Sequence, residues 1–561
     1  MSKEMWVTTI VALMVAGSSP ASAQQCAEGV VGSGPRARRV VIEFVREDSA
    51  TVHLFTRPAR QLALSAVSGS QLAAGDTAVI EVGDHRPRAI MLRSGRDTLR
   101  AALTDIQPPP SRRDVSGEWT AAIGPGGVIR LVARIAELSC GAVTGAFDSP
   151  DQGQRDLPFT GARFSGDSIV IAASYLGLEV ALPLSGTDIR NARFTQGASE
   201  TRVSFTRGAA SALNRPQEPK RPFPYSEREV RFTSRSWAAP LVGTLTLPPG
   251  GGPHPAVVLI SGSGAQDRDE TVAGHKPFLV LSDHLTRRGY AVLRFDDRST
   301  GMQTTLDQTA DDVEGAVAHL RSLSEIDATR IGLLGHSEGG YVAPLIASRD
   351  RRIAALILLG APAVSGHDVF LAQSSAMLRA SGAAEDEVRV DSLIRATVFA
   401  VMRRSPADTG LARLVDSATA HLVQRLSPDD RKRADTWFGA RTPAQDSSAF
   451  MLWRSPWFKS LLRHDAEGVL GAVDLPVLAI YGTFDLQVPA SPNVAALERV
   501  FRARNSSRLT TRLLPGVNHM MQPATSGAMD QYRLIEQTIA EPVLAALDAW
   551  LAKHMPVASA R

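Results

Sequence analysis

The feature that most constrains the fold of this chain is residues 330–340, which read R-I-G-L-L-G-H-S-E-G-G. They hold Ser337 with one glycine two positions before it and another two positions after it. This Gly-x-Ser-x-Gly pattern is typical of a strand that turns sharply into a helix, with the serine in a strained conformation at the apex. A chain rich in glycine and serine also produces the pattern by chance. Here, apolar runs at 331–334 and 354–359 enclose a helical pattern, which predicts the βαβ unit that the turn requires.

In such a turn the Ser337 hydroxyl points out over the C-terminal edge of a parallel sheet. The backbone amide of Glu338, at the start of the helix, points toward the same space. Together they predict a nucleophile and one of the two donors that hold the oxyanion formed from a carbonyl group.

Alternating strand and helix patterns continue on both sides of this unit. Strands are predicted at 230–233, 241–247, 256–261, 291–296, 331–334, 354–359, 477–481 and 510–514, and helices near 276–288, 309–322, 341–348, 493–502 and 530–553. Eight strands with the serine turn after the fifth predict an α/β-hydrolase fold with a mostly parallel sheet. The helical pattern at about 363–473, between strands six and seven, predicts a cap.

A serine hydroxyl is a poor nucleophile at neutral pH, so it needs a base and a carboxylate that orients the base. In this fold the order along the chain is serine, acid, histidine. Asp485 follows the seventh strand and His519 follows the eighth, so both are expected at the edge where Ser337 emerges. The competing carboxylate, Asp474, precedes the seventh strand and is expected at the opposite edge.

Other interpretations of the histidines remain open. His519 also fits an ordinary surface histidine. His336 is a weaker candidate base because, next to Ser337 on a tight turn, it would point elsewhere. His464 lies in the predicted cap, with no matching acid.

The loop after the third strand reads I-S-G-S-G-A-Q-D-R-D at 260–269, and is rich in glycine where backbone must approach a substrate oxygen. By position, the amide of Ser263 is predicted to be the second oxyanion donor, beside that of Glu338. A phosphate-binding loop is the alternative, but neither of its glycine signatures is present. The charged residues 267–269 are predicted to form a structural ion-pair cluster at the pocket wall rather than a proton-transfer site.

The 561 residues are too many for one core, and two to four domains are expected. Residues 1–23 have the pattern of a cleaved signal peptide, which predicts export to the periplasm or the extracellular space; a membrane anchor is the alternative. In an oxidising compartment Cys26 and Cys140, the only cysteines, are predicted to form a disulfide, although two buried thiols also fit.

Short alternating apolar runs predict two β modules, at residues 24–110 and 111–210. The passage from Gly75 resembles the passage from Gly166, as expected for a duplication. One larger barrel or sandwich is the alternative. Within the second module, residues 147–153 contain two acids that are predicted to shape a turn rather than a calcium site. A linker at 211–225 then leads to the predicted catalytic domain at 226–561.

Seven segments carry a family resemblance: FDSPDQG at 147–153, ISGSGAQDRD at 260–269, RFDDR at 294–298, GHSEGG at 335–340, SPWF at 455–458, YGTFDLQVP at 481–489 and LPGVNHMMQ at 514–522. From residue 119 to its end, the chain resembles secreted bacterial α/β-hydrolase esterases with an N-terminal β domain, of the serine-aminopeptidase-like sequence group. The resemblance implies a serine carboxylic-ester hydrolase with Ser337, Asp485 and His519 as its triad.

The expected substrates are small esters with short to medium acyl chains, and neither a metal nor an organic cofactor is expected. The aromatic residues Trp453, Trp457 and Phe458 are predicted to form an apolar wall for the acyl chain. A serine aminopeptidase or dipeptidyl-peptidase-like hydrolase is the alternative, but the acidic run at 385–391 fits a solvated helix face better than an ammonium site. A binding protein on an inactive hydrolase scaffold is a third hypothesis. A net charge of +4 without long basic runs argues against nucleic acid, and the oligomeric state stays open.

Overall fold

The computed structural model describes residues 214–557 apart from 299–302, 406–409, 439–452 and 505. Between residues 116 and 208 it describes all but 124–128, 139–141, 153, 166–167, 184–187 and 197–198, and before residue 116 it describes strands β1–β9 alone. The predicted signal peptide and Cys140 lie outside the described residues, so export and the disulfide stay predictions. The chain divides into two units, Met1–Ala212 and Leu213–Arg561.

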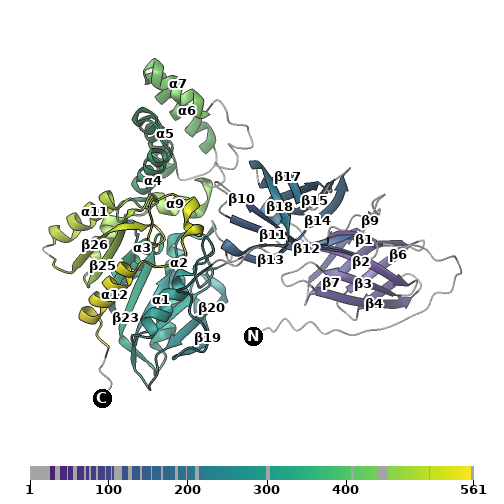
Figure 1. The fold of residues 1–561 in the computed structure, drawn as a ribbon, viewed down its shortest axis with the longest axis horizontal. Coiled ribbons are helices and arrows are strands. Elements are labelled where there is room, and N and C mark those ends of the chain that lie inside the picture. Colours follow the sequence, from purple (N-terminus) through teal and green to yellow (C-terminus); the bar gives the residue numbers. More distant parts are fainter. Residues whose placement is uncertain are drawn as a thin grey trace. The chain divides into compact units, whose positions relative to one another are not determined.

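The first unit contains two nine-stranded sheets (Figure 1). In the first sheet each strand from β1 to β7 pairs antiparallel with the next, and β9 pairs antiparallel with β1. Its strands are β1 (Cys26–Val31), β2 (Arg38–Arg46), β3 (Ser49–Leu54), β4 (Arg60–Ser68), β5 (Gln71–Ala74), β6 (Ala78–Gly83), β7 (Arg86–Ser94), β8 (Asp97–Ala102) and β9 (Thr104–Asp105).

The second sheet has the order β13-β12-β11-β10-β18-β17-β16-β15-β14. Its strands are β10 (Gly117–Ile123), β11 (Ile129–Glu137), β12 (Val143–Ser149), β13 (Gln154–Pro158), β14 (Gly161–Ser165), β15 (Ser168–Ala173), β16 (Leu178–Pro183), β17 (Asp188–Gln196) and β18 (Ser199–Arg207). The two passages that match in sequence contain β6 and β15, each the sixth strand of its sheet along the chain. The module boundary near residue 110 remains a proposal.

The acidic turn of the second sheet is held by one buried side chain. Asp151 is fully buried and accepts hydrogen bonds from the Arg130 amide at 2.7 Å and from the Arg130 guanidinium at 2.7–3.0 Å. These bonds tie the turn that carries Asp151 to β11. No group of three or more metal-binding side chains is found anywhere in the part of the chain that the structure describes.

The second unit is built on an eight-stranded sheet of order β19-β20-β22-β21-β23-β24-β25-β26. Its strands are β19 (Ser226–Ser234), β20 (Trp237–Leu247), β21 (His254–Ile260), β22 (Ala291–Phe295), β23 (Ile326–His336), β24 (Ile353–Leu359), β25 (Val477–Phe484) and β26 (Leu509–Asn518). The first two strands are antiparallel to their neighbours, and the strands from β21 onward run parallel. The prediction of an α/β-hydrolase fold is confirmed, with every predicted strand present.

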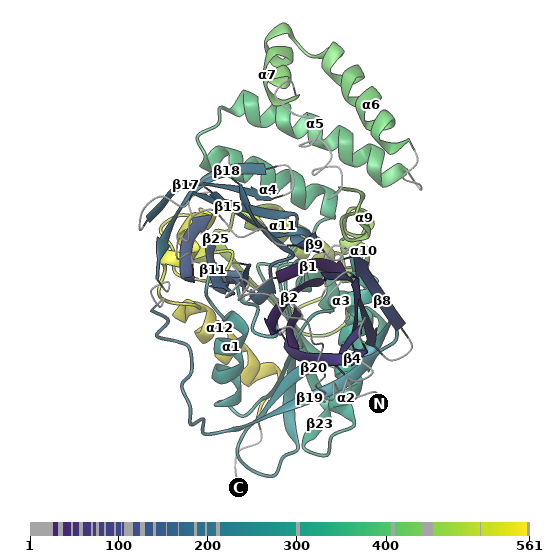
Figure 2. The ribbon, with the colours of Figure 1, turned by 90° about the vertical axis from the view of Figure 1, so that its right-hand side faces the viewer.

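Helices cover both faces of this sheet (Figures 1 and 2). They are α1 (Pro277–Thr286), α2 (Leu306–Arg321), α3 (Gly339–Arg349), α11 (Ala490–Ala503) and α12 (Glu541–His554). On β21, Val258 and Ile260 pack with α2 and α3, whereas Val257 and Leu259 pack with α1 and α12. Side chains alternate between the faces of a strand, so a strand covered on both faces must be apolar throughout.

The last helix starts later than predicted. Helix was expected from residue 530, but 529–534 form a short 3-10 helix and α12 begins at Glu541. The amides of Thr538 and Ile539 donate to the Gln217 side chain, and that of Ala540 donates to the Met521 carbonyl. Because these amides have partners outside the helix, they cannot form its internal hydrogen bonds.

The chain between β24 and β25 forms the predicted helical cap, in which α5–α7 extend beyond α4 and α9 (Figure 1). Its described helices are α4 (Gly366–Ala380), α5 (Glu385–Arg404), α6 (Leu411–Arg425), α7 (Pro428–Phe438), α9 (Pro456–Arg463) and α10 (Ala466–Ala472). The start of α4 touches α9 so closely that a Cβ atom on Gly366 would lie 2.3 Å from the Leu461 carbonyl oxygen. No helix among the described residues is both long enough and apolar enough to cross a membrane.

The expectation of a solvated acidic face on the cap was wrong at one residue. Glu385 is exposed and pairs with Arg379, as a surface acid would. Asp391, however, is fully buried, where it pairs with Arg395 at 2.9 Å and accepts from the Ser374 hydroxyl at 2.7 Å. Its position one helical turn before an arginine, facing α4, explains the burial.

Candidate active site

Ser337 lies at the junction of β23 and α3, in the strained conformation that its motif predicts. Its φ is 52°, in the left-handed region. A Cβ atom on Gly335 would lie 2.2 Å from the Gly339 carbonyl oxygen, and one on Gly339 would lie 2.3 Å from the Ile260 carbonyl oxygen. Side chains at either position would collide with backbone, so the turn requires both glycines. The Ser337 amide donates to the Leu359 carbonyl at 3.0 Å, which ties the turn to β24.

The structure brings Ser337, His519 and Asp485 together from three loops at one edge of the sheet. His519 Nε2 lies 3.0 Å from Ser337 Oγ, and His519 Nδ1 lies 2.9 Å from Asp485 Oδ2. The other Asp485 oxygen, Oδ1, accepts from the amides of Gln487 and Val488 at 3.0 and 2.7 Å. A carboxylate fixed in this way places a proton on Nδ1 and leaves Nε2 free to accept one from the serine.

The loop that carries His519 is held by a pair of buried amide side chains. The Asn518 side-chain Nδ2 donates to the Gln522 side-chain Oε1 at 2.9 Å, and the backbone amide of Gln522 donates to Asn518 Oδ1 at 3.0 Å. Beneath the loop, a Cβ atom on Gly360 would lie 3.0 Å from Asp485 Oδ2 and 3.2 Å from His519 Nδ1. The side-chain pair holds the loop of His519, and the close approach of Gly360 leaves no room for a side chain beneath the imidazole and its acid.

The competing residues lie elsewhere. Asp474 precedes β25, its side chain is 53% exposed, and it faces Arg504 and Arg508 at 3.7 and 3.5 Å. The ring of His464 packs against Tyr341 with centroids 4.7 Å apart. His336 points away from Ser337 Oγ, toward a buried carboxylate that the sequence analysis did not single out.

That carboxylate belongs to Glu270, in the loop after β21. Its Oε1 accepts from the Gly262 amide at 2.6 Å and lies 2.9 Å from His336 Nδ1. Among the described residues, the neighbouring amides of Ser263 and Glu338 have no acceptor in the protein. Those two amides are therefore available to a substrate oxygen, whereas the Gly262 amide is not.

The Glu338 side chain links this loop to the cap. Its carboxylate accepts from the Trp457 indole of α9 at 2.6 Å and also from the Ser263 side chain. Burial raises the pKa of the Glu338 carboxyl, and these two donors oppose the rise. A cavity of about 20 Å³ lies beside Glu338 and Trp457, with Asp297 and Arg298 also on its wall.

Asp297 is a second half-buried acid beside the same cavity. Burial raises the pKa of its carboxyl to about 8, although the Gln266 amide and the Ser261 hydroxyl donate to it, each at 3.0 Å. The negative charges of Glu338 and Glu270 raise it further. The Asp297 carboxyl is thus mostly protonated at neutral pH.

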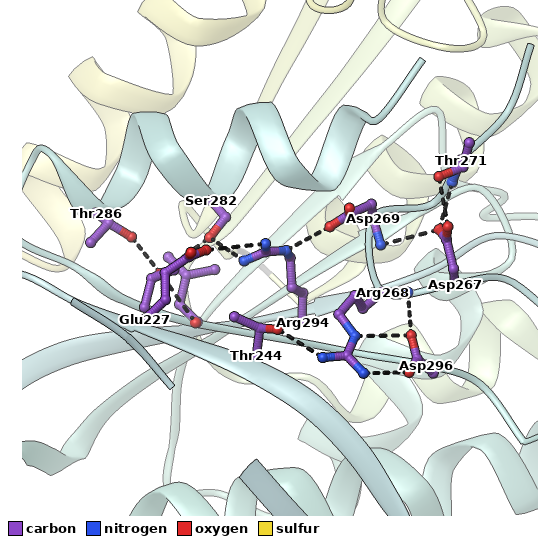
Figure 3. Close-up of polar contacts among 12 residues, drawn as sticks. Glu227, Thr244, Asp267, Arg268, Asp269, Thr271, Ser282, Thr286, Arg294 and Asp296 are labelled. Atoms are coloured by element: carbon purple, nitrogen blue, oxygen red, sulfur yellow. Dashed lines mark hydrogen bonds and ion pairs between the residues drawn. The ribbon is translucent and has the colours of Figure 1, made fainter. Parts of the chain in front are cut away.

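The charged residues of the loop after β21 lie in an ion-pair network with β20 and β22 (Figure 3). Arg268 pairs with Asp296 at 2.5 Å and also donates to Thr244 at 2.8 Å. Asp269 accepts from the buried Arg294 at 2.8 Å. Asp267 instead accepts from the amide and the hydroxyl of Thr271 at 2.9 and 2.7 Å, so the ion-pair prediction holds for Arg268 and Asp269 and not for Asp267. The two ion pairs fasten the loop that carries Ser263 to the sheet.

The three aromatic residues of the cap divide between two roles. Phe458 is buried and stacks on Phe370, with ring centroids 4.8 Å apart, and Trp453 meets Phe399 edge to face at 6.5 Å. These two belong to the core of the cap. Only Trp457 lines the cavity beside Glu338. The predicted acyl wall therefore remains a proposal for Trp457.

Comparisons with known proteins agree with this architecture. The family described as "Serine aminopeptidase, S33" matches residues 276–427. Esterase EstD of Thermotoga maritima is 27% identical over 286 residues, which cover 50% of this chain and 58% of that protein. Acyl-coenzyme A thioesterase 1 of Mus musculus is 30% identical over 199 residues, which cover 35% of this chain and 41% of that protein. The chain thus spans about half the length of these curated relatives.

Among solved structures, the esterase Pf2001 of Pyrococcus furiosus aligns with 62% of this chain and 98% of its own, at 15% sequence identity and a TM-score of 0.34. The strand order and the serine turn place the second unit in the α/β-hydrolase fold. The second unit thus has the α/β-hydrolase fold, and the chain is similar in sequence to an esterase.

Proposed function

We propose that this chain is a serine carboxylic-ester hydrolase that acts on esters with short to medium acyl chains. The observation that carries the proposal is the chain of hydrogen bonds from Ser337 Oγ through His519 to Asp485, at 3.0 and 2.9 Å. These distances are within the reach that proton transfer requires.

In the proposed mechanism His519 Nε2 takes the Ser337 proton as the serine oxygen bonds to the ester carbonyl carbon. The carbonyl oxygen becomes an oxyanion, held by the amides of Ser263 and Glu338. His519 then protonates the departing alcohol, which leaves an acyl group on Ser337. Water repeats the sequence on the acyl-enzyme, giving the free acid and the original serine.

An ester is favoured over a peptide because the acids near Ser337 already have partners. An aminopeptidase needs a carboxylate for the substrate's terminal ammonium, but Glu338 is engaged by Trp457 and Ser263. Asp297 is engaged by Ser261 and is mostly protonated. An amide also needs closer control of its leaving nitrogen than an ester needs of its oxygen.

The test is a panel of substrates with wild type and Ser337→Ala. p-Nitrophenyl acetate and butyrate are expected to turn over much faster than aminoacyl anilides, and an acyl thioester is included because one relative is a thioesterase. Ser337→Ala is expected to lower turnover by several orders of magnitude, since the triad acts as a unit. A fluorophosphonate probe should label Ser337 in the wild type. Absence of label would favour a binding protein on an inactive scaffold, and faster anilide turnover would favour a peptidase.

We also propose that the protein is exported, with residues 1–23 removed, and that Cys26 and Cys140 are joined in the mature chain. The support is the sequence pattern described above. The domains proposed with it are the β modules at 24–110 and 111–210, and the hydrolase at 226–561. N-terminal sequencing of mature protein tests the cleavage, and thiol titration of the unfolded, unreduced protein tests the disulfide.

A further inference from the structure

Directly behind the triad lies a second acid and histidine that the proposed mechanism does not use. Glu270 is 2% exposed and His336 is 6% exposed. His336 Nδ1 lies 2.9 Å from Glu270 Oε1, and His336 Nε2 lies 3.0 Å from the backbone carbonyl oxygen of His519. Glu270 Oε1 also accepts from the Gly262 amide at 2.6 Å. The pair thus joins the loop of the oxyanion donors to the loop of the base.

The groups around His336 favour protons on both of its ring nitrogens. A backbone carbonyl can only accept, so His336 Nε2 must carry a proton. With Glu270 ionised, its Oε1 accepts from both the Gly262 amide and His336 Nδ1. In that state both ring nitrogens of His336 donate, which is the imidazolium form.

The surroundings stabilise that charge. The groups that face His336 are the carboxylates of Glu270 and Asp485 and the imidazole of His519, whose ring centroid is 5.0 Å away. Burial by itself lowers the pKa of His336. The attraction of Glu270 and the hydrogen bonds to Glu270 and His519 outweigh it, and the pKa of His336 lies above its ordinary value.

We propose that His336, held as an imidazolium by Glu270, is a positioning residue that fixes the His519 backbone relative to the Ser263 loop, and that loss of its proton sets the alkaline limit of activity. The proposal rests on the esterase function proposed above. When the proton leaves, the lone pair on His336 Nδ1 faces the Glu270 carboxylate, and the two loops lose their link. Displacements of about 1 Å in such a site cost on the order of 100-fold in rate.

The test is the pH profile of kcat/KM for p-nitrophenyl butyrate between about pH 5 and pH 10, with three variants. His336→Gln is expected to lower kcat by about 10- to 100-fold with little change in KM, and to remove the alkaline limb. Glu270→Gln keeps an acceptor but removes the charge, so the alkaline limb should move down by about one pH unit or more while activity below it is retained. His284→Gln is the matched control, because His284 is bound to Asp548 at 2.8 Å on helices away from Ser337 and should leave the profile unchanged.

A purely structural role would lower kcat equally at every pH in both variants and leave the alkaline limb in place, which would overturn the proposal. The protonation state is also measurable without turnover, by nitrogen NMR of histidine-labelled protein with His336→Gln for assignment. We expect protons on both ring nitrogens of His336 at neutral pH, and a neutral ring would refute the proposal. If the wild type is active and is labelled at Ser337, but the variants keep the alkaline limb of the wild-type pH profile, this inference alone is rejected. A wild type that neither turns over esters nor takes the label rejects the esterase function instead.

Discussion

Replacing Asp485 with asparagine tests the proposed base at the atom that sets its tautomer. Asparagine has the shape of aspartate, but one of its two terminal atoms donates rather than accepts. In the native site Asp485 Oδ1 accepts two backbone amides, and Oδ2 faces His519 Nδ1 at 2.9 Å. The orientation of the new amide decides the outcome.

Two orientations compete, and their energies differ clearly. If the asparagine oxygen keeps the two backbone amides, its NH₂ group faces His519 Nδ1. The opposite orientation points NH₂ at the amides of Gln487 and Val488, and each buried donor left unpaired costs about 1–3 kcal/mol. The first orientation is therefore expected. It makes Nδ1 an acceptor and moves the ring proton to Nε2, which then points at Ser337 Oγ and cannot accept from it.

Because most of the enzyme then holds the wrong tautomer, kcat is expected to fall by about 10⁴-fold. At about 1.36 kcal/mol per tenfold change, this equals about 5.4 kcal/mol of lost transition-state stabilisation. The assay is p-nitrophenyl butyrate hydrolysis near neutral pH, with thermal unfolding to show that the fold is retained. Asp474→Asn is the control, and its exposed position predicts a change of less than about twofold. The assignment of the acid would be refuted if kcat fell by less than tenfold in Asp485→Asn, or if kcat fell further in Asp474→Asn than in Asp485→Asn.

Two further perturbations address the half-buried acids Glu338 and Asp297. Trp457→Phe removes the indole donor to Glu338 and should lower the free energy of unfolding by about 1–3 kcal/mol more than Trp550→Phe does. Trp550 is the control because its indole nitrogen is buried without a partner among the described residues. Equal losses for the two variants in denaturant unfolding would contradict this. For Asp297, the raised pKa of about 8 means that the folded chain keeps a proton that the unfolded chain releases above about pH 4, so this group's contribution to stability falls as pH rises from about 4 to about 8. Asp297→Asn should therefore show a smaller drop in Tm between about pH 5 and pH 9 than the wild type, and an identical drop would show that Asp297 does not titrate in that range.

The strands of the hydrolase unit could be predicted because they are buried on both faces. Every residue of β21 from Pro255 to Ile260 is buried, and a continuous apolar run of that length can be recognised in the sequence as a buried strand. Ser337, Asp485 and His519 could be placed by a similar argument, since each follows the C-terminal end of a strand in a sheet whose order was known once the serine turn was recognised.

The residues that escaped prediction depend on contacts between distant segments. Glu270 is 66 positions from His336, and its φ of 51° is set by a loop that has no repeating pattern. Asp391 looks like part of a surface run until α4 places Ser374 against it. The late start of α12 depends on Gln217, more than 300 positions away in the sequence. Local patterns contain no information about partners of this kind.

The contact between Gly366 and Leu461 also bears on how such a protein can change over generations. The chain leaves for α5–α7 and returns at one narrow point, so a recombination event that exchanged the segment between these two residues would leave the sheet and its loops intact. Asn493, which holds the amides of Ala363 and Val364, lies outside the exchanged segment and would keep the junction in place. Trp457 lies inside it. A chimera with a foreign cap would therefore need to supply its own indole, or another donor, to the Glu338 carboxylate.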